Sequence, residues 1–215
     1  MASYTLAVLS GGRGKRIGGY KPLVQLCGRP LICHVLDNLS PLAQERILLV
    51  HDKKQEGILS KTVKRCGHRA SVVSDLPGEN LPIVGLYTAS LYSTGEVILV
   101  APTDTPFLTP KPYRRLLEAL GDKDAAVPRW PNGYLEPLIA VYRAEPLRRA
   151  TRQALEEGKL RSRAPLSYMD AVYVPVSEVF DDPAMETFNV NSQEDLARAE
   201  EICRRMLKAR EAIPR

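Results

Sequence analysis

Closely spaced cysteines are missing from this chain of 215 residues. Its four cysteines are Cys27, Cys33, Cys66 and Cys203, and no Cys-x-x-Cys pair is present. Metal sites built from thiolates need such pairs, and disulfide frameworks are typical of short, cysteine-rich secreted chains. The sequence therefore argues against both, and we expect the cysteines to be buried structural thiols.

Long apolar runs are also missing. No run approaches the roughly 20 apolar residues that cross a bilayer. The first apolar segment, residues 6–9, is too short for the core of a signal peptide. We therefore expect a cytoplasmic protein that has no membrane partner.

Aromatic residues make up only 6% of the chain, and its net charge of +5 is not gathered in one stripe. Surfaces that bind nucleic acids combine a basic stripe with aromatic side chains. We therefore expect no nucleic-acid partner. An anionic small substrate accounts equally well for the basic clusters at 13–21 and 143–163.

What the chain does have is a glycine-rich, cationic loop directly after a short apolar segment. The segment ends at Leu9, and residues 10–16 read Ser-Gly-Gly-Arg-Gly-Lys-Arg. Glycines let backbone N–H groups close on an anion, and Arg and Lys add positive charge there. A Walker loop would need Ser or Thr where Arg16 stands, and the dinucleotide fingerprint would need Gly at Ile17. The loop indicates a nucleotide-using enzyme of another kind.

Strand-like and helix-like segments alternate along the whole chain. Strands are expected at 4–10, 46–51, 70–74, 96–101, 124–128, 136–142 and 171–176. Helices are expected at 30–39, 53–66, 83–93, 110–120, 145–157 and from 192 onward. This alternation predicts the α/β class, with a Rossmann-like, mostly parallel sheet covered by helices on both faces. The length fits one domain, residues 1–215.

Three of these helices carry recognisable start signals. Pro30 suits a first helical position. Thr109 followed by Pro110 is a cap with proline directly behind it. Ser192 and Asp195 have the spacing of a capping box.

Two carboxylates follow expected strands at the edge where an open parallel sheet binds ligands. Asp75 follows 70–74, and Asp104 follows 96–101. Mg²⁺ prefers oxygen ligands and takes only one or two from protein beside a phosphate. Asp104 is therefore a candidate metal ligand, although a turn or cap aspartate before Pro106 fits equally well. Lys21 and Arg16 can reach phosphate from the loop, or can be ordinary surface cations.

A second polar pair occurs late in the chain. Alternation places Asn189 and Asn191 on one side of an extended segment, opposite Phe188 and Val190. Two neutral amides can orient a metal, its water or a phosphate oxygen. Asn191 can also simply lead into the cap of the last helix.

Taken together, these motifs resemble the molybdenum cofactor guanylyltransferase family, within the nucleotidyltransferases of Rossmann-like fold. The matching segments follow the family's order over nearly the whole chain. They are residues 9–16, 18–19, 21–23, 28–31, 75, 82–85, 104–107, 136–138 and 189–192.

The resemblance implies a set of site residues. The expected nucleotide-binding residues come from the glycine loop and from positions that match the family's nucleotide-binding positions. They are Leu9, Ser10, Gly11, Gly12, Arg13, Gly14, Lys21, His51, Asp75 and Asp104. The expected catalytic residues are Arg16, Lys21 and Asp104, with Asp104 as the Mg²⁺ ligand. The expected acceptor or product site comprises Glu136, Asn189 and Asn191.

The chain also departs from the better-known members of the family. His51 stands where they often have Asn, and Glu136 stands where they have His. The loop before Lys21 is one residue short, and residues 158–163 replace a tighter Gly-Glu-Arg-Arg motif.

The resemblance further implies that a terminal phosphate of molybdopterin attacks the α-phosphorus of GTP, with release of pyrophosphate. The partners are then GTP and a phosphorylated cofactor precursor, and the protein is a monomer or a small homo-oligomer. Alternatives are a guanylyltransferase for adenosylcobinamide phosphate, a cytidylyltransferase for the same molybdenum cofactor, and a non-catalytic nucleotide-binding protein. Sugar-phosphate nucleotidyltransferases fit less well, since their chains usually carry extra domains.

Overall fold

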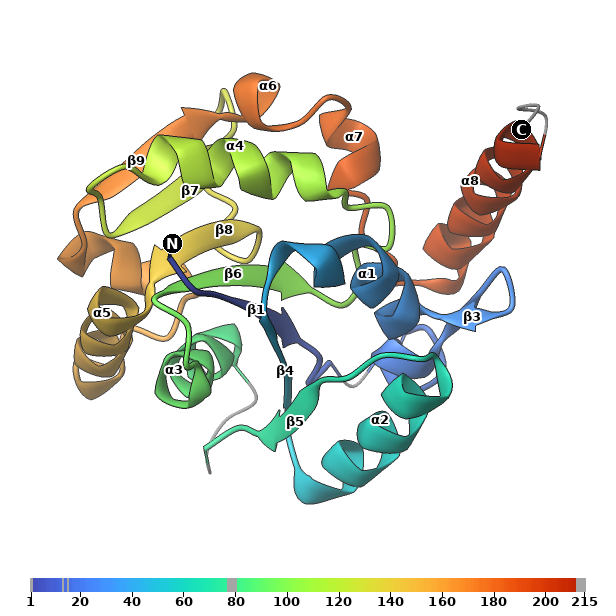
Figure 1. The fold of residues 1–215 in the computed structure, drawn as a ribbon, viewed down its shortest axis with the longest axis horizontal. Coiled ribbons are helices and arrows are strands. Elements are labelled where there is room, and N and C mark those ends of the chain that lie inside the picture. The colour runs from blue at the N-terminus through green and yellow to red at the C-terminus, as the bar shows by residue number, and fades with distance from the viewer. Residues whose placement is uncertain (1, 13, 15, 77–80, 212–215) are drawn as a thin grey trace.

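A seven-stranded sheet forms the centre of the protein (Figure 1). The computed structural model describes residues 2–12, 14, 16–76 and 81–211. The strands are β1 (Tyr4–Leu9), β4 (Glu45–Val50), β5 (Ser71–Ser74), β6 (Val97–Pro102), β7 (Ala125–Arg129), β8 (Ala140–Arg143) and β9 (Ala171–Pro175). Their order is β5-β4-β1-β6-β8-β7-β9. β8 runs antiparallel to β6 and β7, whereas the other pairings of this sheet are parallel. The predicted α/β fold with a mostly parallel sheet is confirmed.

Helices cover both faces of the sheet, because alternate strand residues point to opposite sides. In β1, Leu6 and Val8 join one core cluster, and Ala7 joins the other. The first cluster includes residues of α1 (Leu31–Leu39), α2 (Lys53–Arg65), α4 (Pro110–Leu120) and α6 (Val176–Val179). The second includes residues of α3 (Pro82–Tyr92) and α5 (Ala144–Glu156), which lie together below the sheet in Figure 1.

Several short elements were not predicted. They are a hairpin of β2 (Gln25–Leu26) and β3 (Arg29–Pro30), the short helices α6 and α7 (Pro183–Glu186), and the 3₁₀ turns η1 (Lys21–Leu23), η2 (Ser40–Leu42) and η3 (Ala164–Tyr168). Such elements span too few residues to show a helical or strand period. No helix in the described part of the chain is long and apolar enough to span a bilayer.

The three predicted helix starts have different outcomes. Ser192 and Asp195 form the expected capping box, in which the Asp195 N–H donates to Ser192 Oγ and the Ser192 N–H to Asp195 Oδ2. Thr109 is the N-cap before Pro110, but its hydroxyl bonds the buried Glu186 instead of its own helix. The prediction for Pro30 is wrong by one position. Pro30 pairs with Gln25 in the hairpin, so it is the N-cap and α1 begins at Leu31.

The strand predicted at 136–142 is also wrong in its first half, because β8 begins only at Ala140. The Glu136 N–H donates to the Pro128 carbonyl, and the Ile139 N–H turns back to the Glu136 carbonyl at 3.1 Å. Pro137, inside this turn, has no N–H to offer a neighbouring strand. Residues 136–139 therefore form a turn that leads into β8.

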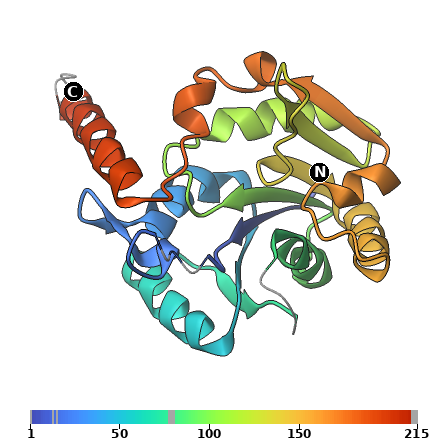
Figure 2. The same ribbon diagram turned by 180° about the vertical axis from the view of Figure 1, so that it is seen from behind.

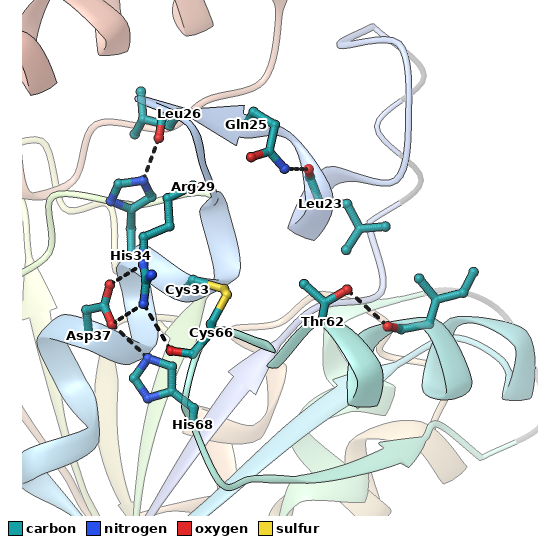
Figure 3. Close-up of a disulfide and its surroundings, with 11 residues drawn as sticks. Leu23, Gln25, Leu26, Arg29, Cys33, His34, Asp37, Thr62, Cys66 and His68 are labelled. Atoms are coloured by element: carbon teal, nitrogen blue, oxygen red, sulfur yellow. Dashed lines mark hydrogen bonds and ion pairs between the residues drawn. A yellow bond between two sulfur atoms is a disulfide. The ribbon is translucent and has the colours of Figure 1, made fainter. Parts of the chain in front are cut away.

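The structure contradicts the prediction of unpaired thiols. Cys33 on α1 is bonded to Cys66 at the end of α2, and Cys27 in the hairpin is bonded to Cys203. Figure 3 shows the first disulfide beside an ionic cluster of Arg29, Asp37 and His68. The partners lie 33 and 176 residues apart in sequence, so only the folded chain brings them together.

The helix α8 (Gln193–Glu211) extends away from the body in both views (Figures 1 and 2). Its first half packs Leu196, Ala199 and Ile202 against a cluster that includes Leu26 of the hairpin and Phe107. The Cys27–Cys203 disulfide and a 2.7 Å bond from the Cys27 N–H to Glu200 fasten the hairpin to this half. The start of α8, with the asparagines before it, is thereby held at the sheet edge.

Candidate functional site

A cavity of about 390 Å³ opens at the carboxyl ends of β1, β5 and β6. The sheet order places these ends along one edge, as expected for a ligand site in an open parallel sheet. The residues that line it come from both halves of the chain. They are Leu9, Gly11, Gly12, Lys21, Pro22, Leu49, Asp75, Leu81, Pro82, Gly85, Pro102, Thr103, Asp104, Tyr134, Glu136, Pro137, Leu138, Ile139, Ser162 and Asn189.

The ammonium group of Lys21 joins three segments of the chain at this cavity. Lys21 Nζ donates to Asp104 Oδ2 at 2.9 Å and to Asn191 Oδ1 at 2.6 Å. Only 16% of the Lys21 side chain and 18% of the Asp104 side chain are exposed, so water screens this pair weakly. The structure therefore brings together the cation, the carboxylate and one amide that the sequence singled out.

Backbone contacts hold the asparagine segment in place. The Val190 N–H donates to the Asp104 carbonyl at 2.9 Å, which fastens the late segment to the loop after β6. The Asn191 N–H donates to Asp195 Oδ2, so the cap of α8 also orients Asn191. Asn189 is exposed at the cavity and donates its side-chain amide to the Thr187 carbonyl. Asn191 thus accepts a hydrogen bond from Lys21 with its side chain and donates one to the cap residue Asp195 with its backbone.

Asp75 is a half-buried carboxyl at the end of β5. Its N–H continues the sheet by donating to the Val50 carbonyl, and among the described residues no donor reaches its buried Oδ1. Burial raises the pKa of Asp75 to about 6, against smaller opposing contributions from Thr88 and His51. A buried acceptor without a donor costs stability, so this side chain is poised for a ligand's N–H or O–H group.

The first turn of α3 approaches the glycine loop closely. A Cβ atom on Gly85 would lie 2.6 Å from Leu9 Cδ2, and Asp75 Oδ1 would be 3.8 Å away. Leu9, Asp75 and Gly85 therefore converge on one side of the cavity, where Pro82 begins α3. A side chain at position 85 would therefore require the end of the Leu9 side chain to shift.

Glu136 lies on the other side of the cavity. Trp130 Nε1 donates to Glu136 Oε1 at 2.8 Å. Burial raises the pKa of the Glu136 carboxyl, and the bond from Trp130 lowers it by less. The carboxyl is therefore held in a fixed direction by an aromatic donor.

Other predicted residues have different positions. The Ser10 hydroxyl is buried against Thr103 Oγ1 at 2.7 Å, and the Ser10 N–H donates to Leu49, so its polar groups serve the fold. The Gly14 carbonyl accepts N–H groups of residues 17–19, and a positive φ of 55° explains the glycine. Arg16 is exposed and does not line the cavity, and Arg13 lies outside the described residues. His51 follows β4 and contributes a charge that lowers the pKa of Asp75.

Tyr134 and Ser162 are among the cavity-lining residues that the sequence analysis did not name as site residues. Tyr134 lies between a Trp-Pro-Asn-Gly turn and Glu136. An aromatic residue this close in sequence to a candidate site residue could have indicated a place in the site. Ser162 lies in the basic segment 158–163, and the correspondence of that segment to the family's Gly-Glu-Arg-Arg motif was the available signal.

Oxygen ligands for a cation are present in this arrangement. Asp104 Oδ2 and Asn191 Oδ1 converge on one positive group, the Lys21 ammonium. Within the described residues, no group of three His, Cys, Asp or Glu side chains is placed to hold a metal. The donors fit a hard cation that takes most of its ligands from a phosphate and water, and they do not fit a cation that needs an all-protein cage.

Comparison with known proteins places this chain in a family. The sequence profile described as the MobA-like NTP transferase domain matches residues 6–169. A probable molybdenum cofactor guanylyltransferase from Thermococcus gammatolerans is 34% identical over 195 residues, which is 89% of this chain and 96% of the relative. One from Methanosarcina mazei is 36% identical, over 88% of this chain and 86% of the relative.

Solved structures agree with this assignment. The crystal structure of molybdopterin-guanine dinucleotide biosynthesis protein A from Archaeoglobus fulgidus has a TM-score of 0.78 and 33% identity, covering 94% of this chain and all of that one. A 2-C-methyl-D-erythritol 4-phosphate cytidylyltransferase from Thermus thermophilus has a TM-score of 0.66 at 19% identity, over 95% of this chain and all of that one, which shows the fold alone. This chain is thus a nucleotidyltransferase that belongs to the family of MobA-like NTP transferases.

Proposed function

We propose that this protein transfers GMP from GTP to the terminal phosphate of molybdopterin and releases pyrophosphate. The observation that carries the proposal is the convergence of Lys21, Asp104 and Asn191 at the cavity edge. The names of relatives that are about a third identical over most of the chain support GTP and a molybdopterin acceptor.

In the proposed reaction the acceptor's phosphate oxygen attacks the α-phosphorus of GTP in line with the leaving pyrophosphate. No covalent enzyme intermediate is required, so catalysis consists of positioning and charge neutralisation. Lys21 binds the phosphates, and the loop at Gly11 and Gly12 gives the phosphates close access to the backbone. Arg16, which is exposed on the same loop, adds positive charge there.

Nucleotidyltransferases of this family generally use a divalent metal. We propose Mg²⁺, held by the carboxylate of Asp104 with the amide oxygens of Asn189 and Asn191 nearby. When bound, it neutralises charge on the transferring phosphate. Lys21, whose ammonium contacts Asp104 Oδ2, would bind the phosphates beside this ligand. The chain therefore needs only one carboxylate here, because the substrate brings the other anionic ligands.

On this assignment the two sides of the cavity bind different substrates. Leu9, Gly85 and Asp75 bind the nucleotide, with Asp75 accepting a hydrogen bond from it. Glu136 and Asn189 face the acceptor and the dinucleotide product. His51 acts on the nucleotide side through its charge near Asp75.

The deciding experiment measures pyrophosphate release with each of the four NTPs and Mg²⁺, with molybdopterin or adenosylcobinamide phosphate as acceptor. Release with GTP and molybdopterin alone is the expected result. Release with adenosylcobinamide phosphate would move the enzyme to that acceptor, and release with CTP would change the base. Tight GTP binding without release for any pair would make the protein a non-catalytic nucleotide binder.

A further inference from the structure

Two half-buried carboxyls flank the Lys21–Asp104 pair along the sheet edge. Asp75 follows β5, Asp104 follows β6, and Glu136 precedes β8, so the sheet order places one carboxyl on each side of the pair. All four side chains line the same cavity. The proposed function uses Asp75 for the nucleotide and leaves the chemistry of the Glu136 side open.

The structure holds Glu136 firmly. Its backbone N–H and carbonyl are both used, by Pro128 and Ile139, and Trp130 Nε1 occupies Oε1. No donor to Oε2 is found among the described residues. A fixed carboxylate of this kind selects a ligand that presents N–H groups, because it can only accept.

Tyr134 supplies a flat, accessible surface beside this carboxylate. Its side chain is 55% exposed and lines the cavity two residues before Glu136. Its backbone is fixed on both sides, since its N–H donates to Asn132 Oδ1 and its carbonyl accepts from the Trp130 N–H. An exposed aromatic ring on a fixed backbone can cover one face of a planar heterocycle without further ordering.

We propose that Glu136 and Tyr134 form a binding site for a 2-amino-4-oxo-pyrimidine ring of the acceptor, the ring that a pterin carries. This inference rests on the proposed function. Glu136 accepts the two adjacent N–H donors of that ring, from N3 and the 2-amino group, and Tyr134 stacks on its face. Guanine presents the same donor edge, and on the nucleotide side Asp75 is the matching acceptor. When the dinucleotide product is bound, Asp75 would contact its guanine end, Glu136 its pterin end, and Lys21 the phosphates between them.

The proposal gives Glu136 a role in choosing the acceptor. A corrin acceptor such as cobinamide phosphate has no 2-amino-4-oxo edge, so it would leave Glu136 Oε2 without a donor while Trp130 still holds Oε1. A site built to hydrogen-bond a substrate rejects analogues that lack the matching group more strongly than an apolar pocket does.

The test compares free pterin with lumazine, which has an oxygen where pterin has the 2-amino group. Binding is measured by titration of the fluorescent pteridines, with the nucleotide side filled by the α,β-methylene analogue of GTP, which cannot transfer GMP. The wild-type protein is expected to bind pterin about tenfold or more tightly than lumazine. Glu136→Gln is expected to lose this preference, because one acceptor oxygen becomes a donor.

Tyrosine variants test the stacking part. Tyr134→Ala is expected to weaken both pteridines about tenfold without changing their ratio, and Tyr134→Phe is expected to bind as wild type does. The matched control is Tyr92→Ala, because Tyr92 is 51% exposed and does not line the cavity. Unchanged binding of the GTP analogue in every variant shows that the fold and the nucleotide side are intact.

Equal binding of pterin and lumazine by the wild type, or an unchanged preference in Glu136→Gln, would overturn the inference. Guanylyl transfer to molybdopterin is measured separately. Transfer without the pterin preference refutes this site and leaves the proposed function standing. The pterin preference without transfer refutes the proposed function and keeps the site.

Discussion

The two sides of the cavity are built in different ways. On the Asp75 side, parallel strands deliver residues at their carboxyl ends, so each site residue follows an apolar strand in the sequence. On the Glu136 side, the antiparallel strand β8 has its amino end at the cavity, and the site residues precede it in a turn. Site residues that follow a parallel strand can thus be predicted from their position in the sequence. Site residues in a turn before an antiparallel strand cannot be predicted in this way.

The two carboxyls also differ in their partners. Asp75 has a buried oxygen that no donor among the described residues reaches, and burial raises its pKa to about 6. Glu136 has Trp130 as a donor, which offsets part of the increase in its pKa. The nucleotide side therefore carries more unsatisfied polarity than the acceptor side, and pH should affect it more.

The largest expected effect comes from the residue that both sides share. Asp104→Ala should lower kcat by about 10²–10³-fold or more, because Lys21 and the metal both lose their carboxylate. The variant should still fold, since the Asp104 backbone still bonds Val190, but its melting temperature should fall because the weakly screened Lys21 ammonium loses its partner. Steady-state pyrophosphate release is the measurement, and Asp170→Ala, at an exposed ion pair with Lys123, is the control. Wild-type turnover in Asp104→Ala with Mg²⁺ would contradict the assignment.

A smaller loss is expected for Lys21→Met, which keeps the length of the side chain and removes its charge. We expect kcat to fall about 10²-fold, because one donor to the phosphates is lost. Lys53→Met is the matched control, since Lys53 is exposed and forms a surface ion pair with Glu56. Should both variants retain full activity, the phosphate role of Lys21 would be wrong.

Asp75→Asn separates the nucleotide side from the acceptor side. The KM for GTP is expected to rise about tenfold at about pH 8, with the KM for the acceptor unchanged, because a charged acceptor becomes neutral. In the wild type the KM for GTP should rise as pH falls through about 6, where Asp75 becomes protonated. An increase of the acceptor KM instead would place the nucleotide elsewhere.

The same substitution should stabilise the protein without ligand. The pKa of Asp75 is raised on folding from 3.8 to about 6, so its contribution to stability is present below about pH 4 and is lost as pH rises through 6. At about pH 8, Asp75→Asn should raise the free energy of unfolding by about 1–2 kcal/mol, since water still screens part of the carboxyl. Melting curves at both pH values measure this, and a gain that persists at pH 4 would argue against burial of the charge as its cause.

The smallest effect is expected for Gly85→Ala, which adds one methyl group on the nucleotide side. The new Cβ atom would displace the end of the Leu9 side chain into the cavity, at a cost of about 1 kcal/mol or a fivefold rise in the KM for GTP. Gly57→Ala is the control, because a Cβ atom on Gly57 of α2 has no neighbour within 4 Å. An unchanged KM for GTP would show that Leu9 yields without affecting the nucleotide.

The sequence predicted the elements that carry a clear period or a strong start signal. The apolar strands β1, β4 and β6 and the helices α2, α4 and α5 lie within one or two residues of their predicted bounds. The prediction of a strand was wrong for the first half of 136–142. Apolar residues around Pro137 have the composition of a strand, and only the backbone hydrogen bonds show that they form a turn. The disulfides were missed because nothing in the spacing of the cysteines shows which pairs meet.

By itself, then, the sequence determined the α/β class, the glycine loop and the family resemblance, because these depend on local patterns of residues in order. It also named Lys21, Asp104 and Asn191, which the fold brings within hydrogen-bond distance. Only the tertiary structure decided that Ser10 serves the core, that Arg16 lies outside the cavity, and that Tyr134 lines it beside Glu136. Those outcomes depend on the order of strands in the sheet and on the direction of each side chain, and both are set by packing between segments far apart in the chain.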